Sequence, residues 1–223
     1  MTTIETIQYY WPELMTSLKE TAIMMGISLT VCVIGGLPLG VGLFLANPQL
    51  KSRRPWLYWS INLMITLIRS FPYLLFVVTL IPFTRWLIGF AFGPIPAAVP
   101  LSIVAVAVFA RLVEQVLLDV PTDIRLLADS LGAKEWQYVV HFLLLEARSG
   151  LILAFTTTTV SMVSYSTVMG IVGGGGIGDF AIRYGYQRYE YGIMYVAIGF
   201  MIFTVFLIQI TGNVLARKLD KRK

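Results

Sequence analysis

Charged side chains are scarce in this sequence. Only 13% of the 223 residues are Asp, Glu, Lys or Arg, whereas 57% are hydrophobic and the mean hydropathy is +0.77. A soluble globular domain carries about 25% charged residues. The deficit excludes an ordinary soluble domain and indicates a chain that is solvated largely by lipid. The net charge of +5 does not indicate nucleic-acid binding, because the basic residues are scattered between apolar runs and form no face.

Residues for covalent, metal or nucleotide chemistry are also scarce. The sequence holds one cysteine, Cys32, and one histidine, His141. A single cysteine excludes an intrachain disulfide, and one Cys with one His argues against a metal site. We expect Cys32 to pack as a small hydrophobic residue. There is no G-x(4)-G-K-[ST] motif, and the apolar runs lack His, Asp and a nucleophile–base pair. We therefore expect no enzyme activity and no cofactor in this chain.

What the sequence has is long apolar runs. A helix that crosses a bilayer needs about 20 mostly apolar residues. Five runs meet this length: about 21–46, 57–83, 95–118, 151–172 and 191–214. The sequence predicts an all-α integral membrane protein that forms a single domain over residues 1–223. Its five transmembrane helices leave a long loop, about 119–150, between the third and the fourth.

The orientation follows from the basic residues, which favour the inner side of a membrane. Placing the C-terminus inside puts the basic residues of segments 47–56, 111–150 and 215–223 on the inner side. Few basic residues then remain outside: Lys19, Arg85, Arg183 and Arg188. We therefore predict an outer N-terminus and a cytoplasmic C-terminus.

The loop at 119–150 is too polar to span a membrane and too periodic to be disordered. Ile124, Leu127, Leu131 and Tyr138 recur at roughly helical spacing, and Gly132 indicates a break or a turn between two short helices. Such an amphipathic loop either lies on the membrane surface or docks into a groove of a soluble partner. Composition does not separate these two roles.

A glycine run follows the fourth apolar segment. Gly173, Gly175 and Gly178 satisfy the spacing G-x-G-x-x-G, which marks a dinucleotide loop only between a strand and a helix. Here the run follows a membrane helix and lies outside the membrane. We interpret Gly173, Gly175, Gly176 and Gly178 as a gate or outer loop, where the helix end unwinds and backbones approach closely.

Two sets of polar residues lie inside apolar runs. Thr157, Ser161 and Ser164 share one helical face with Tyr165 beside it, and the hydroxyls either line a wet passage or pack against a neighbouring helix. Arg69 lies inside the second run, where an isolated charge is costly and marks function. The alternative is that the arginine belongs to a helix break at 69–72 and reaches an outer vestibule.

A further pair of charged residues lies in the third run. Arg111 and Glu114 are three residues apart, and we expect them to pair locally.

The loop resembles the EAA loop of ABC importer permeases, whose pattern is E-A-A-(x)3-G-(x)9-I-x-L-P. Ala128 matches the third position of that pattern and Gly132 its glycine, whereas Leu126, Leu127 and Leu145 replace its Glu, first Ala and Pro. Four further segments look like methionine ABC importer permeases, in the same order: RSFPYLLFVVTLIPFTR (69–85), ARLVEQVLLDVP (110–121), GGGGIGD (173–179) and YGYQRY (184–189).

The resemblance implies a transport subunit in the bacterial cytoplasmic membrane. It implies a homodimer of this chain, two ABC ATPase subunits that supply ATP and Mg²⁺ chemistry, an external substrate-binding lipoprotein and surrounding lipid. The ATPase-coupling residues would be Asp123, Arg125, Ala128, Asp129 and Gly132.

The pathway for methionine or a related amino acid would then include Arg69, Thr157, Ser161, Ser164 and Tyr165. The open alternatives are an ABC permease for another amino acid, such as a polar one or cystine, and a secondary transporter or channel. The last is disfavoured because five spans do not divide into paired halves.

Overall fold

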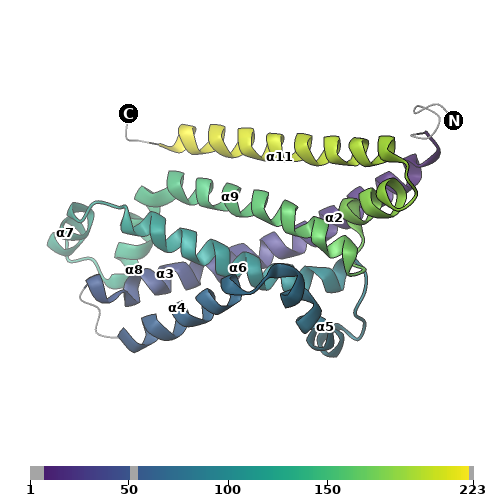
Figure 1. Ribbon diagram of the computed structural model, residues 1–223. Helices are drawn as coiled ribbons and strands as arrows, with labels where there is room; N and C mark the ends of the chain where they lie inside the picture. The colour runs from purple at the N-terminus through teal and green to yellow at the C-terminus, as the bar shows by residue number, and fades with distance from the viewer. Residues whose placement is uncertain (1–7, 51–54, 221–223) are drawn as a thin grey trace.

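The structure is a computed structural model that describes residues 8–50 and 55–220 (Figure 1). These residues form helices and connecting turns, with no strand among them. The longer helices are α2 (Trp11–Val31), α3 (Leu37–Ala46), α4 (Pro55–Ser70), α5 (Tyr73–Ile88), α6 (Pro94–Leu118), α7 (Asp123–Ser130), α9 (Leu144–Ile171) and α11 (Tyr191–Leu219). The short segments are η1 (Cys32–Gly36), η2 (Pro48–Leu50), α8 (Glu135–Gln137), η3 (Tyr138–Leu143), α10 (Gly176–Phe180) and η4 (Ala181–Tyr186).

Four unbroken helical stretches are long and apolar enough to cross a membrane. They cover Trp11–Ala46, Pro94–Leu118, Glu135–Ile171 and Tyr191–Leu219, and the bent pair α4–α5 adds a fifth if the two helices together form one broken span. The all-helical membrane class is thus confirmed. The first and fourth helices begin well before residues 21 and 151, because amphipathic turns extend the apolar runs that the sequence marks.

The second run differs most from its expected form. Instead of one continuous helix over 57–83, two helices, α4 and α5, meet at an angle of 109°. Proline at Pro72 disfavours the helical conformation for the residue before it and supplies no backbone N–H. The helix therefore ends at Ser70, and a new one begins at Tyr73 in another direction.

Glycines allow the first helix to lie close against α6. A Cβ added at Gly40 would lie 2.5 Å from the Cβ of Val113, and one added at Gly36 would lie 3.0 Å from a ring carbon of Phe109. Between α2 and α3 the helix widens into the π-helical segment η1. Small residues are what membrane helices use for such close contact, because the backbones themselves can then touch.

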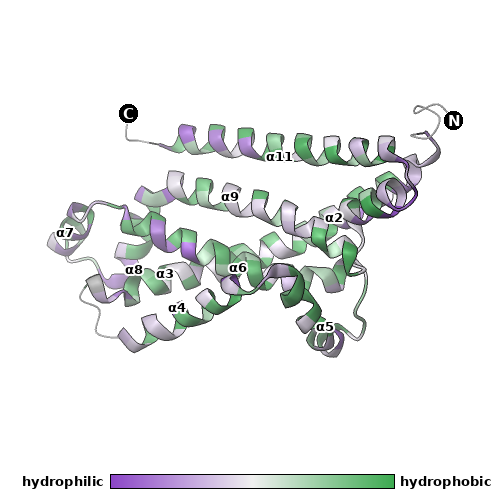
Figure 2. Cartoon of the chain, viewed as in Figure 1, coloured by the Kyte–Doolittle hydropathy of each residue, from purple (hydrophilic) through white to green (hydrophobic). Residues whose placement is uncertain are grey.

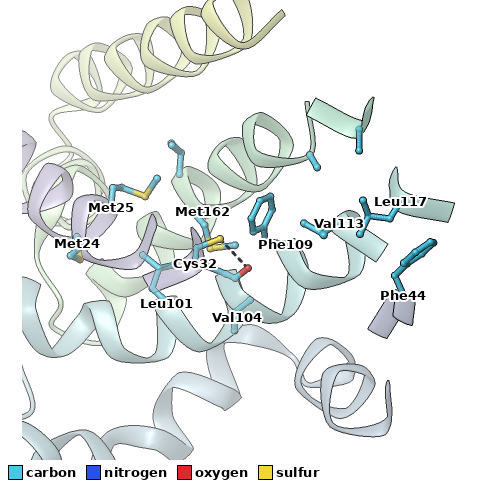
Figure 3. Close-up of a cluster of buried hydrophobic side chains, with 14 of the residues drawn as sticks. Met24, Met25, Cys32, Phe44, Leu101, Val104, Phe109, Val113, Leu117 and Met162 are labelled. Atoms are coloured by element: carbon cyan, nitrogen blue, oxygen red, sulfur yellow. Dashed lines mark hydrogen bonds between the residues drawn. The ribbon is translucent and has the colours of Figure 1, made fainter. Parts of the chain in front are cut away.

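The core of the molecule surrounds α6, which packs against α2, α3, α4 and α9. Buried side chains such as Leu101, Val113 and Leu117 fill the space between these helices (Figure 3). Cys32 is fully buried there, with its sulfur 3.5 Å from the carbonyl oxygen of Ala105. The prediction that this cysteine packs as a hydrophobic residue is confirmed.

The outside of the molecule is apolar along its middle and polar at its ends. Figure 2 shows hydrophobic residues along the central parts of the helices and hydrophilic ones gathered at α7 and at the C-terminal end of α11. Large apolar side chains on α4 and α11 are exposed, among them Trp59, Leu63, Ile202 and Phe203. Such a band is what a protein surrounded by lipid must present.

Candidate translocation pathway and coupling loop

The loop between α6 and α9 forms a tight corner of two helices. At its centre Gly132 has φ +68°, a left-handed conformation that favours glycine. The N–H of Ala133 donates to the Ala128 carbonyl at 3.0 Å, and the N–H of Gly132 donates to the Asp129 carbonyl at 3.0 Å. These two bonds form a Schellman motif, which satisfies the last carbonyls of α7. The predicted turn at Gly132 is therefore present.

Arg125 holds the two sides of this corner together. Its Nη1 and Nη2 donate to the two carboxylate oxygens of Glu135, both at 2.9 Å, and its Nε lies 3.3 Å from Asp129. The guanidinium also lies over the Tyr138 ring, 4.4 Å from its centroid. The hydrogen bonds that Arg125 donates to Glu135, aided by the charges of the Glu135 and Asp129 carboxylates, raise the pKa of Arg125 above its ordinary value. Because these groups are partly exposed, the network adds at most about 1 kcal/mol to stability.

The other predicted coupling residues occupy different positions in this corner. Ala128 is fully buried, whereas Asp123 lies exposed in the first turn of α7. Glu135 was not among the predicted residues, although an acidic residue just beyond the predicted turn could have indicated it. The corner also leaves four large apolar side chains exposed: Leu126, Leu127, Leu131 and Trp136. All four belong to this corner, and we refer to them together as the apolar tip.

The polar side chains of α9 divide into two faces. Thr157 and Ser164 are exposed and Ser161 is half-buried, whereas Thr159 and Ser166 on the other side are buried. The Ser161 hydroxyl donates to the Thr157 carbonyl at 3.0 Å. Its oxygen can therefore still accept a hydrogen bond from outside the helix.

One cavity brings together three of the predicted pathway residues. It has a volume of about 250 Å³ and lies between the α4–α5 break, α6 and α9. Arg69, Ser161 and Tyr165 line it, together with Tyr73. The rings of Tyr73 and Tyr165 stack with centroids 4.4 Å apart, and the Tyr73 hydroxyl lies 3.1 Å from the sulfur of Met169.

A second cavity, of about 340 Å³, lies between α9 and α11. Thr157 and Ser161 line one side of it, and Gln209 and Asn213 line the other. Ser164 lies apart from both, in a further groove that also reaches Gln209. The two amides were missed from the sequence. Their spacing of four residues inside the last apolar run is the signal that could have found them.

The glycine run ends α9 and redirects the chain. Gly173, Gly175 and Gly176 all have positive φ, from +75° to +85°. At Gly178 an added Cβ would lie 2.5 Å from the Cα of Thr167, so two backbones touch there. The unwinding and close approach expected of these glycines are both present. No strand precedes the run in the described part of the chain, so the dinucleotide fingerprint has no structural basis here.

Polar groups of α2 hold the short helix that follows the glycine run. The carboxylate of Glu20 accepts a hydrogen bond from the Gly176 N–H at 2.7 Å, and the Thr21 hydroxyl accepts one from the Ile177 N–H at 2.9 Å. These bonds satisfy N–H groups at the start of α10, and they tie α2 to the segment that follows α9.

Arg111 and Glu114 form the predicted local pair, with 2.6 Å between their Nη1 and Oε2 atoms. Arg111 also donates to the side-chain oxygen of Asn62 on α4. Glu114 is buried, so the pair joins two helices within the core and takes no part in either cavity described above.

Residues 38–223 match the model of the family described as binding-protein-dependent transport system inner membrane component. The chain belongs to this family. It is 39% identical to the probable D-methionine transport system permease protein MetI of Vibrio cholerae over 94% of this chain and 93% of that protein. It is 33% identical to the methionine import system permease protein MetP of Bacillus subtilis, over 71% of this chain and 72% of that protein.

Solved structures share the same fold. A chain of the MetNI methionine ABC transporter in an inward-facing conformation superposes with a TM-score of 0.91 at 33% identity, covering 97% of this chain and 99% of that one. An amino acid ABC transporter with histidines superposes with a TM-score of 0.73 at 17% identity, which indicates a common fold alone.

Proposed function

We propose that this chain is the membrane-spanning permease subunit of an ATP-driven importer of methionine. The observation that carries the proposal is the near-complete match, in fold and at 33% identity, to a chain of a methionine ABC transporter. Relatives of similar length that are named as methionine permeases support the same substrate. The chain itself serves as the passage, and ATP hydrolysis belongs to a separate subunit.

The working assembly contains two copies of this chain, two ATPase subunits and an external binding lipoprotein. The N-terminus lies outside and the C-terminus in the cytoplasm, as the distribution of basic residues favours. The apolar tip at Leu126, Leu127, Leu131 and Trp136 faces the cytoplasm, where a groove of the ATPase covers it.

Coupling follows from the stiffness of the corner between α7 and α8. When the ATPase subunits close, they displace α7, and the Arg125–Glu135 contact transmits this displacement to the start of the long helix Glu135–Ile171. That helix carries the hydroxyls of Thr157 and Ser161 in its middle. The two cavities that these hydroxyls line are therefore the proposed passage.

The function is tested by uptake of labelled methionine in a bacterial strain that lacks its own methionine importers. We expect uptake only when this chain is expressed with its ATPase and its binding protein. An excess of unlabelled methionine abolishes uptake of the label, whereas an excess of histidine or cystine does not. Competition by one of the latter instead would identify another amino acid as the substrate, and uptake without the ATPase would indicate a secondary transporter or a channel.

The coupling role of the apolar tip is tested by co-purification of the ATPase. Leu126→Asp puts a charge on the tip, and we expect it to abolish co-purification while the permease still inserts into the membrane. Leu50→Asp is the matched control, because Leu50 is also exposed and lies in another segment, 47–56, that is predicted to face the cytoplasm. Equal co-purification of both variants would contradict the proposed docking site.

A further inference from the structure

The cavity beside the α4–α5 break contains a guanidinium group without a carboxylate partner among the described residues. Arg69 lines this cavity and takes part in no ion pair or hydrogen bond in the part of the chain that the structure describes. It lies about 21 Å along the α4 axis from Pro55, at 1.5 Å per residue, and thus within the roughly 30 Å of the hydrocarbon layer. An arginine at that depth persists where it faces water or an anion.

The surroundings of Arg69 combine one cationic group with apolar and weakly polar walls. Phe71, Phe76 and the stacked rings of Tyr73 and Tyr165 supply flat apolar surface. Ser161 adds an oxygen that can accept a hydrogen bond, since its proton already points to the Thr157 carbonyl. The cavity therefore offers complementary groups to each part of an amino acid with an apolar side chain.

We propose that this cavity is a transient binding site for the transported amino acid inside the permease, an inference that rests on the proposed function. Arg69 pairs with the α-carboxylate, and the Ser161 oxygen accepts a hydrogen bond from the ammonium group. The side chain lies against the Tyr73–Tyr165 stack. A thioether suits this wall, because sulfur makes favourable contacts with aromatic rings.

The site binds weakly, as transport requires. Arg69 is more than a third exposed, so water screens its attraction for the carboxylate. The cavity shares one lining residue, Ser161, with the second cavity, so the two are neighbours along α9. The external binding lipoprotein selects the amino acid. The cavity at Arg69 then guides the carboxylate of that amino acid past the apolar part of the membrane.

The charge of the cavity is tested with a cysteine at Ser161. In a Cys32→Ala background, Ser161→Cys in the assembled importer is labelled with two thiosulfonate reagents, one bearing a sulfonate and one a trimethylammonium group. Relative to Ser164→Cys, which lies in another groove, we expect about a threefold preference for the anion from a single nearby positive charge. Arg69→Gln removes this preference and Arg69→Lys retains it. If Ser161→Cys shows no preference for the anionic reagent while Arg69 is present, the proposal is overturned. Such a result is expected if an acidic group of a partner neutralises Arg69.

Occupancy is tested in the same labelling assay. Methionine at millimolar concentration should slow labelling of Ser161→Cys, whereas methioninamide, which lacks the carboxylate, should not. Equal protection by both compounds, or by neither, overturns the assignment of Arg69 to the carboxylate. The preference for the anionic reagent does not depend on which amino acid is imported, so it tests the position of Arg69 even if the wild-type complex imports another amino acid.

The effect on transport is tested with a matched pair of arginines. We expect Arg69→Gln to lower the initial rate of methionine uptake about tenfold, while binding-protein-stimulated ATP hydrolysis continues. Arg85→Gln is the control, because Arg85 is exposed near the end of α5 and lines neither cavity. Uptake by Arg69→Gln at the wild-type rate overturns the proposal. Absence of methionine uptake by the wild-type complex instead refutes the proposed function.

Discussion

Gly170→Ala should disrupt the contact between the fourth helix and the segment that follows the glycine run. The new Cβ would overlap the backbone nitrogen of Asp179, and it would lie 2.7 Å from the Asp179 Cα and 2.8 Å from the carbonyl carbon of Gly178. Carbon atoms in contact are normally about 3.5–4.0 Å apart. Because the atoms in the way belong to the backbone, no change of rotamer relieves the overlap, and α10 has to shift by about 1 Å.

The magnitude follows from what this shift disturbs. Overpacking by one methyl group costs about 1–3 kcal/mol. A displacement of α10 also weakens its two hydrogen bonds to Glu20 and Thr21, of which the charged one contributes about 1.5–3 kcal/mol. Because both hydrogen bonds are strained and not wholly lost, we expect the free energy of unfolding to fall by about 2–4 kcal/mol in total.

The assay is thermal unfolding of the purified permease in detergent. A loss of 2–4 kcal/mol in a chain of this length corresponds to a fall in Tm of about 5–15 °C. Gly199→Ala is the control, because its added Cβ would meet no atom of the described residues within 4 Å, so it should change Tm by no more than about 2 °C. If the two variants unfold at the same temperature, α10 is not seated against the end of α9.

Three further predictions concern the loop, its ion pair and the topology. Gly132→Val should reduce coupling of ATP hydrolysis to uptake severalfold, and Gly132→Asn much less, because asparagine tolerates positive φ; equal coupling in both variants would exclude a role for the left-handed turn. Arg125→Glu alone should weaken the coupling of ATP hydrolysis to uptake, and the charge swap Arg125→Glu with Glu135→Arg should restore part of it. A swap that couples no better than the single change would show that this ion pair does not link α7 to the fourth helix. A reporter at the C-terminus should report the cytoplasm and one at the N-terminus the exterior, and finding both ends on one side would refute the five-span topology.

The apolar runs predicted the membrane helices because the bilayer imposes one simple requirement, a minimum apolar length. The same reasoning places the first residues of the first and fourth helices too late in the sequence. Residues 135–150 are polar enough to be read as loop, yet they form helix continuous with α9, because only one face has to pack. The bend at Pro72 was marked by the sequence, but its angle of 109° depends on how α5 packs against α6 and α9.

Residues that act through distant partners were harder to predict. Arg69, Ser161 and Tyr165 were found one by one from their chemistry, and the structure brings all three to one cavity. Glu135 and Glu20 were not found, because the groups that they bind are adjacent only after the chain has turned. At Gly132 an added Cβ would meet no described atom within 4 Å, so the left-handed φ is what favours glycine there.

The helix that runs from Glu135 to Ile171 has a mechanical consequence. Most of it is α9, whose 28 residues measure about 42 Å at 1.5 Å per residue, more than the roughly 30 Å of the hydrocarbon layer. A rod of this length that tilts by about 10° about its centre moves its two ends by about 4 Å in opposite directions. One end of α9 continues through η3 to Glu135, and the other touches α10 through Gly170. A small swing imposed at the end near the loop thus reappears, reversed in direction, at the glycine run, so that opening at one end of the helix and closing at the other become a single movement.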